Sequence, residues 1–151
     1  MGSKVYIRIE LLPYIKTFYE KKYGNPVSFP KKSYMNLLIG ELLTKPPKDY
    51  TDTPNLNALC IELAYYINKD IRSYFHLSLR AKSALKTALR QKFYQSLCDE
   101  VRRSMRILGV TRKAAIYLFI EEYGLGENCF DSLKKKEYRE RRLRPMVKEE
   151  D

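Results

Sequence analysis

The sequence has few of the residues from which most catalytic and metal-binding sites are built. It contains one histidine, His76, and three widely separated cysteines, Cys60, Cys98 and Cys129. The cysteines lack CxxC spacing, His76 has no serine or cysteine partner nearby in the sequence, and no cluster of histidine with acidic residues resembles a metal site. We therefore expect no metal and no cofactor. An odd number of distant cysteines also indicates reduced thiols and a cytoplasmic protein rather than a disulfide framework.

Nucleotide-binding motifs and long apolar runs are missing as well. The sequence contains neither a GxxxxGKS or GxxxxGKT loop nor a GxGxxG turn, which argues against a nucleotide-hydrolysing or dinucleotide-dependent enzyme. The best apolar run, 34–43, is interrupted by Asn36, Gly40 and Glu41, and a membrane span needs about 20 apolar residues. The first residues lack the apolar core of a signal peptide. These absences predict a soluble protein with no membrane partner.

Catalysis has little support in this sequence, and we expect a protein that is not an enzyme. One alternative stays open at this point. Dispersed carboxylates such as Glu10, Glu62 and Asp99 would make a nuclease site if the fold brought them together. The spacing of these residues in the sequence does not decide the question.

What the sequence does have is an uneven excess of positive charge. Residues 69–113 contain 12 basic and 3 acidic residues, and so supply +9 of the net charge of +11. Residues 1–68 carry 9 basic and 6 acidic residues, and residues 114–151 carry 8 and 9. Charge clustered in this way indicates an anionic partner, most often nucleic acid. The alternative is a solvated, solubilising face without a ligand.

The N-terminal part, residues 1–68, predicts a small sheet with two helices. Val5, Ile7 and Ile9 alternate with polar or larger side chains, which indicates a strand over 4–9. Helical spacing follows over 11–23, with a very short strand at 27–29 and then a helix that begins after Ser33 and stops before Pro46. Residues 44–55 form a proline-rich loop. A strand is predicted over 57–66, although so short an apolar run also fits a helix.

The second part, residues 69–144, predicts a helical bundle. Residues 79–108 contain neither proline nor glycine and are rich in helix formers, so they form either one long helix or two helices nearly end to end. Gly109 ends this segment, and Thr111 can cap a helix that Gly124 closes. A last helix begins near Asp131, and residues 145–151 form a frayed tail. The fold class is α+β, and the two parts together make one compact domain.

The long helix carries the first candidate binding surface. Its basic residues lie at or near i, i+4 spacing, so that several share one helix face and can follow a phosphate backbone. A solvated helix face is the alternative interpretation. The predicted nucleic-acid contacts of this segment are Arg80, Lys82, Lys86, Arg90, Arg102, Arg103 and Arg106.

Residues 109–142 form the second candidate. The segment from Gly109 to Leu125, followed by Asp131 to Arg142, resembles the helix-turn-helix proteins of bacteria, their phages and mobile elements. The resemblance implies that the second helix enters the major groove of DNA, with its N-terminal side chains reading bases. On this sequence the implied contacts are Arg112, Lys113, Ser132, Lys134, Lys135, Lys136 and Arg139.

Two departures from that pattern are visible. The connection between Gly124 and Phe130 is longer than the usual turn of three or four residues. Acidic residues also lie near the implied groove, and they would repel phosphate: Glu121, Glu122, Glu127, Glu137 and Glu140. The alternative is an ordinary helical hairpin with a charged outer face.

A third candidate is a mixture of aromatic and basic residues over 65–80. Tyr65, Tyr66, Tyr74 and Phe75 flank Lys69, Arg72 and Arg80, a combination that single-stranded nucleic-acid binders use for stacking. A core role for these aromatic residues is the alternative.

Taken together, these patterns predict a nucleic-acid-binding protein, with duplex DNA as the partner and a regulator or mobile-element accessory protein as the role. A homodimer fits the same pattern. The competing hypothesis is a protein-interaction or assembly module whose basic face meets an acidic partner.

Overall fold

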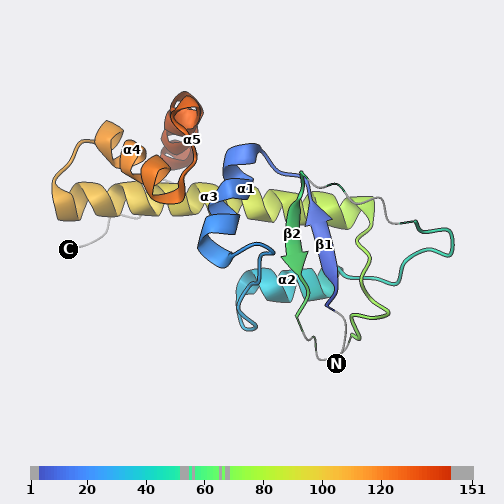
Figure 1. Cartoon of the computed structure of the whole chain (residues 1–151). Helices are drawn as coiled ribbons and strands as arrows, with labels where there is room; N and C mark the ends of the chain where they lie inside the picture. The colour runs from blue at the N-terminus through green and yellow to red at the C-terminus, as the bar shows by residue number, and fades with distance from the viewer. Residues whose placement is uncertain (1–3, 52–54, 56, 65, 67–68, 144–151) are drawn as a thin grey trace. The chain divides into compact units, whose positions relative to one another are not determined.

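The structure is a computed structural model that describes residues 4–51, 55, 57–64, 66 and 69–143. Its elements follow the order β1, α1, α2, β2, α3, α4 and α5, with a short 3₁₀ helix before α5 (Figure 1). The chain divides into two compact units, Met1–Leu89 and Arg90–Asp151. The boundary falls inside α3, so the helix begins in the first unit and ends in the second.

An antiparallel pair of strands organises the first unit. β1 (Tyr6–Ile9) pairs with β2 (Leu59–Glu62) in a register that places Tyr6 opposite Glu62 and Ile9 opposite Leu59. The alternation of Ile7 and Ile9 with more polar residues turns the two isoleucines into the core, as a half-buried strand requires. Both strands were predicted, and both are shorter than predicted.

The other edge of β2 is also occupied. The Val27 N–H donates to the Cys60 carbonyl at 2.8 Å, and the Glu62 N–H donates to the Val27 carbonyl at 2.8 Å. The strand predicted over 27–29 is therefore reduced to this single bridge at Val27. β2 lies between two backbone partners, whereas β1 has β2 as its one strand partner within the described part of the chain.

Two helices complete this unit together with the first part of α3. α1 (Pro13–Tyr23) has Pro13 in its first turn, where its missing N–H costs no hydrogen bond. α2 (Tyr34–Leu42) begins after Ser33, whose hydroxyl accepts from the Asn36 N–H at 3.2 Å, as predicted. The buried core of this unit includes Ile7, Ile9, Ile15, Phe18, Tyr19, Phe29, Met35, Ile39, Leu43, Leu59, Ile61, Leu85 and Leu89.

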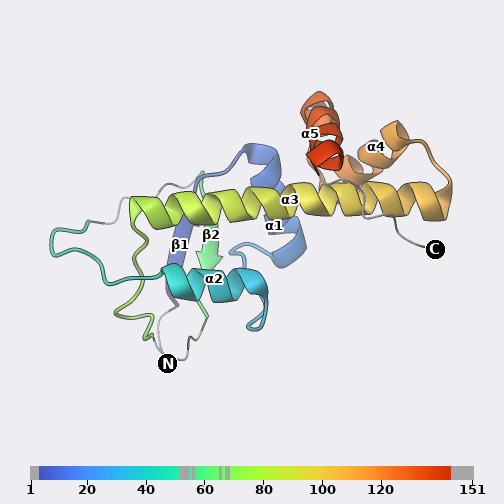
Figure 2. The ribbon, with the colours of Figure 1, turned by 180° about the vertical axis from the view of Figure 1, so that it is seen from behind.

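α3 (Leu79–Leu108) is one unbroken helix of 30 residues (Figure 2). This resolves the sequence-based choice between one helix and two. The helix ends at Gly109, which has a positive φ of 66°, and the Gly109 N–H donates to the Met105 carbonyl at 3.1 Å.

The second unit is a helical assembly made of the rest of α3, α4 (Arg112–Tyr123), the 3₁₀ helix Glu127–Cys129 and α5 (Phe130–Leu143). Thr111 caps α4 by accepting from the Ala114 N–H at 3.2 Å, and Gly124 ends α4 in the left-handed conformation. Both signals were predicted. The buried core includes Phe93, Leu97, Val101, Ala115, Ile116, Phe119, Ile120 and Leu133.

The α+β class predicted from sequence is confirmed, with the small sheet near the N-terminus and the helical region after it. The sequence-based division at 68/69 lies within the first unit. The predicted frayed tail, 145–151, lies outside the described residues. Among the described residues, no helix is both long and apolar enough to cross a bilayer.

Candidate nucleic-acid interface

The buried contacts of α5 determine which side of this helix faces solvent. Leu133 and Glu137 lie one helical turn apart, and both side chains are buried. Glu137 Oε1 accepts from Arg112 Nη1 at 2.9 Å, and Arg141 Nε lies 3.4 Å from the same oxygen. Two guanidinium groups thus face one buried carboxylate, which compensates the cost of removing that charge from water.

The opposite side of α5 is basic and exposed. We define the α5 surface as its exposed side chains Lys134, Lys135, Tyr138, Arg139 and Arg142. Half of Tyr138 is exposed, and the guanidinium carbons of Arg141 and Arg142 lie 5.3 and 5.7 Å from its ring centre. Aromatic rings beside arginine suit contacts with bases and phosphates alike.

The acidic residues around the α5 surface are placed unevenly. Glu137, which the sequence analysis counted against a DNA contact, points away from the surface and is 3% exposed. Asp131 remains exposed in the first turn of α5, where its charge is favourable to the helix dipole. Glu121, Glu122 and Glu127 are exposed on α4 and on the turn before α5. The α5 surface as defined has four basic residues and no acidic residue, while Asp131 is exposed and Glu140 is partly exposed on the same helix.

The residues predicted from the helix-turn-helix resemblance fall into two groups. Lys113, Ser132, Lys134, Lys135 and Arg139 are exposed. Arg112 instead belongs to the Glu137 ion pair, and the Lys136 ammonium lies 5.5 Å from the Tyr94 ring centre. The predicted pair of helices is present as α4 and α5, while the resemblance to helix-turn-helix proteins stays a prediction.

Several arginines of the second unit converge on a cavity of about 340 Å³. Arg102 and Arg106 of α3 line it together with Arg112 of α4 and Arg141 of α5. Glu137 also lines this cavity, and its Oε2 has no hydrogen-bond partner within the described chain. Sequence analysis missed Arg141 and the role of Glu137. The signal available for both was their i, i+4 spacing on the same helix as Leu133.

The remaining predicted cations of α3 are exposed. Arg90 and Arg103 lie in the second unit, and Arg80, Lys82 and Lys86 lie in the first. The side chains of Lys82 and Lys86 form no hydrogen bond or ion pair with another described residue. Their charges are available to an anionic partner.

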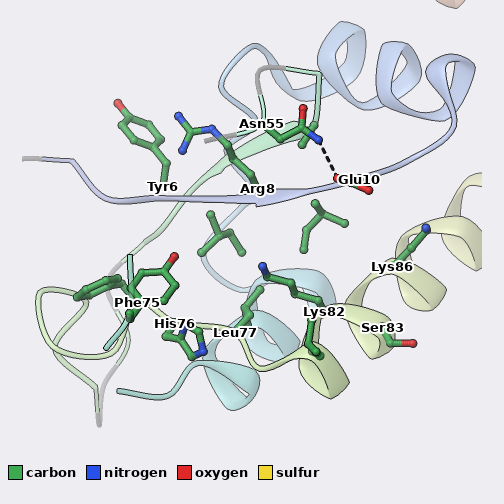
Figure 3. Close-up of a pocket in the computed structure, with 15 residues that line it drawn as sticks. Tyr6, Arg8, Glu10, Asn55, Phe75, His76, Leu77, Lys82, Ser83 and Lys86 are labelled. Carbon is green, nitrogen blue, oxygen red and sulfur yellow. Dashed lines mark hydrogen bonds between the residues drawn. The ribbon is translucent and has the colours of Figure 1, made fainter. Parts of the chain in front are cut away.

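Lys82 and Lys86 also line a cavity of about 530 Å³ beside β1 (Figure 3). Tyr50, Phe75 and His76 form an aromatic wall of this cavity, with the Tyr50 and His76 ring centres 4.8 Å apart. The backbone of His76 is held by paired hydrogen bonds with Thr44, at 2.8 and 3.0 Å. His76 therefore lines a cavity and packs against Tyr50, which its position in the sequence did not indicate.

The aromatic and basic candidate of residues 65–80 has mainly structural contacts. The Tyr66 hydroxyl donates to Asn36 Oδ1 at 3.0 Å, and its ring lies against Gly40, where an added Cβ would lie 2.5 Å from Tyr66 Cδ1. The Tyr74 ring centre lies 5.4 Å from the Lys45 ammonium. This packing of the Tyr66 ring against α2 argues against the stacking of nucleic-acid bases on it. Tyr65 lies outside the described residues.

Lys69 has a structural contact that sequence analysis did not anticipate. Its ammonium donates to the carbonyls of Gly40, Glu41 and Leu43, at 2.7, 3.1 and 2.8 Å. These carbonyls lie at the C-terminal end of α2, where a helix leaves acceptors without partners and favours positive charge. Lys69 therefore caps α2.

Two of the three carboxylates considered for catalysis, Glu10 and Glu62, have partners of their own, and Asp99 is exposed on α3 in the second unit. Glu10 accepts from Asn55 Nδ2 at 2.7 Å, and Glu62 pairs with Lys4 at 3.3 Å. Burial raises the pKa of the Cys60 and Cys129 thiols above the ordinary thiol value, which favours the protonated form over the thiolate. Within the described ranges, no group of three or more histidine, cysteine or acidic side chains is placed to hold a metal ion.

Comparison with protein-family models found no match, and comparisons with curated proteins and with solved structures found none either.

Proposed function

We propose that this protein binds nucleic acid, with duplex DNA as the first candidate, and that the α5 surface makes the main contact. The observation that carries the proposal is the inward position of Glu137. Because Arg112 and Arg141 face that carboxylate on the inner side of α5, the outer side presents Lys134, Lys135 and Arg139 with their charge uncompensated by Glu137.

The mechanism would be electrostatic docking of α5 against the phosphate backbone. Lysine and arginine side chains release counterions from DNA when they replace them at phosphates, which supplies much of the affinity. Ser132, near the N-terminal end of α5, would be placed to meet base edges if this helix enters the major groove. A regulator or an accessory protein of a mobile element is the role that such binding would serve.

The test is a titration of labelled duplex DNA over a series of salt concentrations. The variant Lys134→Ala, Lys135→Ala, Arg139→Ala removes three cations from the α5 surface. Its slope of log affinity against log salt should be smaller by about 2 to 3, because each phosphate contact contributes about 0.9. Affinity at low salt should fall more than about tenfold.

A matched control removes the same charge elsewhere. Lys31, Lys32 and Lys48 are exposed and lie outside the α5 surface, so the triple alanine variant at these positions should keep the wild-type slope. Equal losses in the two triple variants would show that only net charge matters. Absence of salt-sensitive binding by the wild type would refute the proposal, and metal-dependent cleavage of the labelled DNA would replace it with a nuclease.

A further inference from the structure

Among the described residues, the outer edge of β1 has backbone groups without hydrogen-bond partners. The Leu63 N–H donates to the Val5 carbonyl at 2.8 Å, which identifies Val5 and Leu63 as a hydrogen-bonded pair of the antiparallel ladder. Such pairs alternate, so Ile7 and Ile9 also direct their N–H and C=O groups toward β2. The backbone groups of Tyr6 and Arg8 therefore point away from β2, and none has a hydrogen-bond partner among the residues described.

The 530 Å³ cavity runs along this edge. Five consecutive residues, Tyr6 to Glu10, line it, and consecutive residues of a strand share a cavity only when the strand presents its edge. The facing wall includes Leu79, Lys82, Ser83 and Lys86 of α3, whose spacing of i, i+3, i+4 and i+7 defines one side of a helix. We call this space, bounded by β1 and α3, the β1–α3 groove.

Positive charge lies on both sides of the strand edge. In Figure 3, the Arg8 side chain lies on one side of β1, and the Lys82 side chain lies on the other. None of Arg8, Lys82 and Lys86 forms an ion pair with another described residue. Glu10, the one carboxylate among the described residues that line the groove, accepts a hydrogen bond from Asn55 at 2.7 Å.

We propose that the β1–α3 groove binds an extended, acidic segment of another protein, which adds to the sheet as a strand beside β1. The backbone of the segment would pair with the N–H and C=O groups of Tyr6 and Arg8. Its alternating side chains would project to the two sides of the sheet, where acidic groups meet Arg8 on one side and Lys82 and Lys86 on the other. Five strand residues extend over roughly 16 Å, so a short segment is sufficient.

Two other occupants fit this edge less well. A phosphate backbone offers acceptors only, so it leaves the carbonyls of Tyr6 and Arg8 without donors. A second copy of this chain, paired through its own β1, would bring further Arg8 and lysine side chains to the same groove, and like charges facing each other are unfavourable. An acidic peptide satisfies both the backbone groups and the charge.

The experiment compares two substitutions at Arg8 in the full chain. Arg8→Ala removes the charge but keeps the N–H, whereas Arg8→Pro also removes the N–H that points away from β2. Proline is tolerated at such a position of an edge strand because no bond to the neighbouring strand is lost. Circular dichroism and thermal unfolding of both variants show whether the fold as a whole is retained.

The probe is a random peptide library displayed on phage and selected against the wild-type protein, followed by titration of the enriched peptides. We expect enrichment of acidic sequences, a loss of affinity of no more than a few-fold with Arg8→Ala, and a loss of more than about tenfold with Arg8→Pro. If Arg8→Pro is unfolded, hydrogen exchange in the wild type decides instead, because the bound peptide should protect the Tyr6 and Arg8 amides.

Several results would overturn the inference. These are no enrichment, equal effects of the two variants, no protection of the two amides, or a single-stranded oligonucleotide that competes for the groove. Sedimentation showing a dimer that Arg8→Pro dissociates would assign the edge to a second copy. The α5 surface contributes no residue to this groove, so titration of DNA with the Arg8→Pro variant separates a failure here from a failure of the proposed DNA binding.

Discussion

Lys69 shows how a basic residue in the most highly charged third of the chain can serve the fold rather than a ligand. Its three carbonyl contacts use every donor of the ammonium group at the end of α2. The sequence around Lys69 does not indicate its capping role, because the carbonyl acceptors lie 26 to 29 residues earlier in the chain. Charge counting alone therefore overstates the positive surface available to DNA.

Replacing Lys69 by methionine should destabilise the first unit. The substitution keeps much of the apolar length but leaves the carbonyls of Gly40, Glu41 and Leu43 without this donor. Hydrogen bonds to charged groups contribute about 1.5–3 kcal/mol, and we expect a loss of this order in the free energy of unfolding. Urea unfolding followed by circular dichroism measures it. Lys48→Met, at an exposed loop position, is the control, and an equal small effect of both variants would argue against the capping role.

At the scale of the elements, local signals in the sequence located several helix ends, although they left open whether 79–108 is one helix or two. Ser33 and Thr111 cap the helices that follow them, and Gly109 and Gly124 lie at the ends of α3 and α4. These signals act within four or five residues of the chain, so spacing reveals them. The partner of each strand edge and the contacts of the β1–α3 groove depend on residues far apart in the sequence, and no local pattern specifies them.

The exposed cations of α5 could be predicted from the sequence, whereas its buried contacts were harder to predict. Exposed Lys134, Lys135 and Arg139 follow from composition, while the inward position of Glu137 follows from its placement one turn after Leu133. The sequence analysis counted Glu137 among the acidic residues near the implied groove, since an acidic residue is rarely buried without a partner and no partner is visible nearby in the sequence. Arg112, which is 25 residues earlier, supplies that partner.

Glu137→Ala should destabilise the second unit by about 1–3 kcal/mol. This loss is smaller than removing one partner of a fully buried ion pair usually causes. Arg112 and Arg141 are partly exposed, so their guanidinium groups can regain contact with water once the carboxylate is removed. Glu137→Gln keeps the shape and one acceptor, and its loss should be smaller. Denaturant titration measures both variants against Glu121→Ala, an exposed position on α4. A neutral result for Glu137→Ala would contradict a stabilising role for the pair.

At the scale of the whole molecule, the cations predicted on α3 lie in both units. Lys82 and Lys86 belong to the first unit and Arg90 to the second, and all three are exposed. A DNA molecule that contacts both α3 and α5 would therefore meet cations of both units.

Replacing Lys82, Lys86 and Arg90 together with alanine should flatten the salt dependence of DNA binding, because fewer counterions would be released. If α3 and α5 both contact the same DNA, the decreases in slope of the α3 and α5 triple variants should add in the combined variant. The measurement is the titration over salt concentrations described for the α5 surface. An unchanged slope in the α3 triple variant would restrict DNA binding to α5.

The strand pairing has a consequence for the order in which the chain folds during synthesis. β1 must wait for β2, since Tyr6 pairs with Glu62, and the Tyr19 hydroxyl in α1 donates to the Leu89 carbonyl in α3 at 2.6 Å. The first unit therefore cannot complete its core until residues up to Leu89 have left the ribosome. Its N-terminal strand is made first but is among the last parts to gain its native contacts, so the apolar side chains of β1 stay exposed to solvent until β2 has been made.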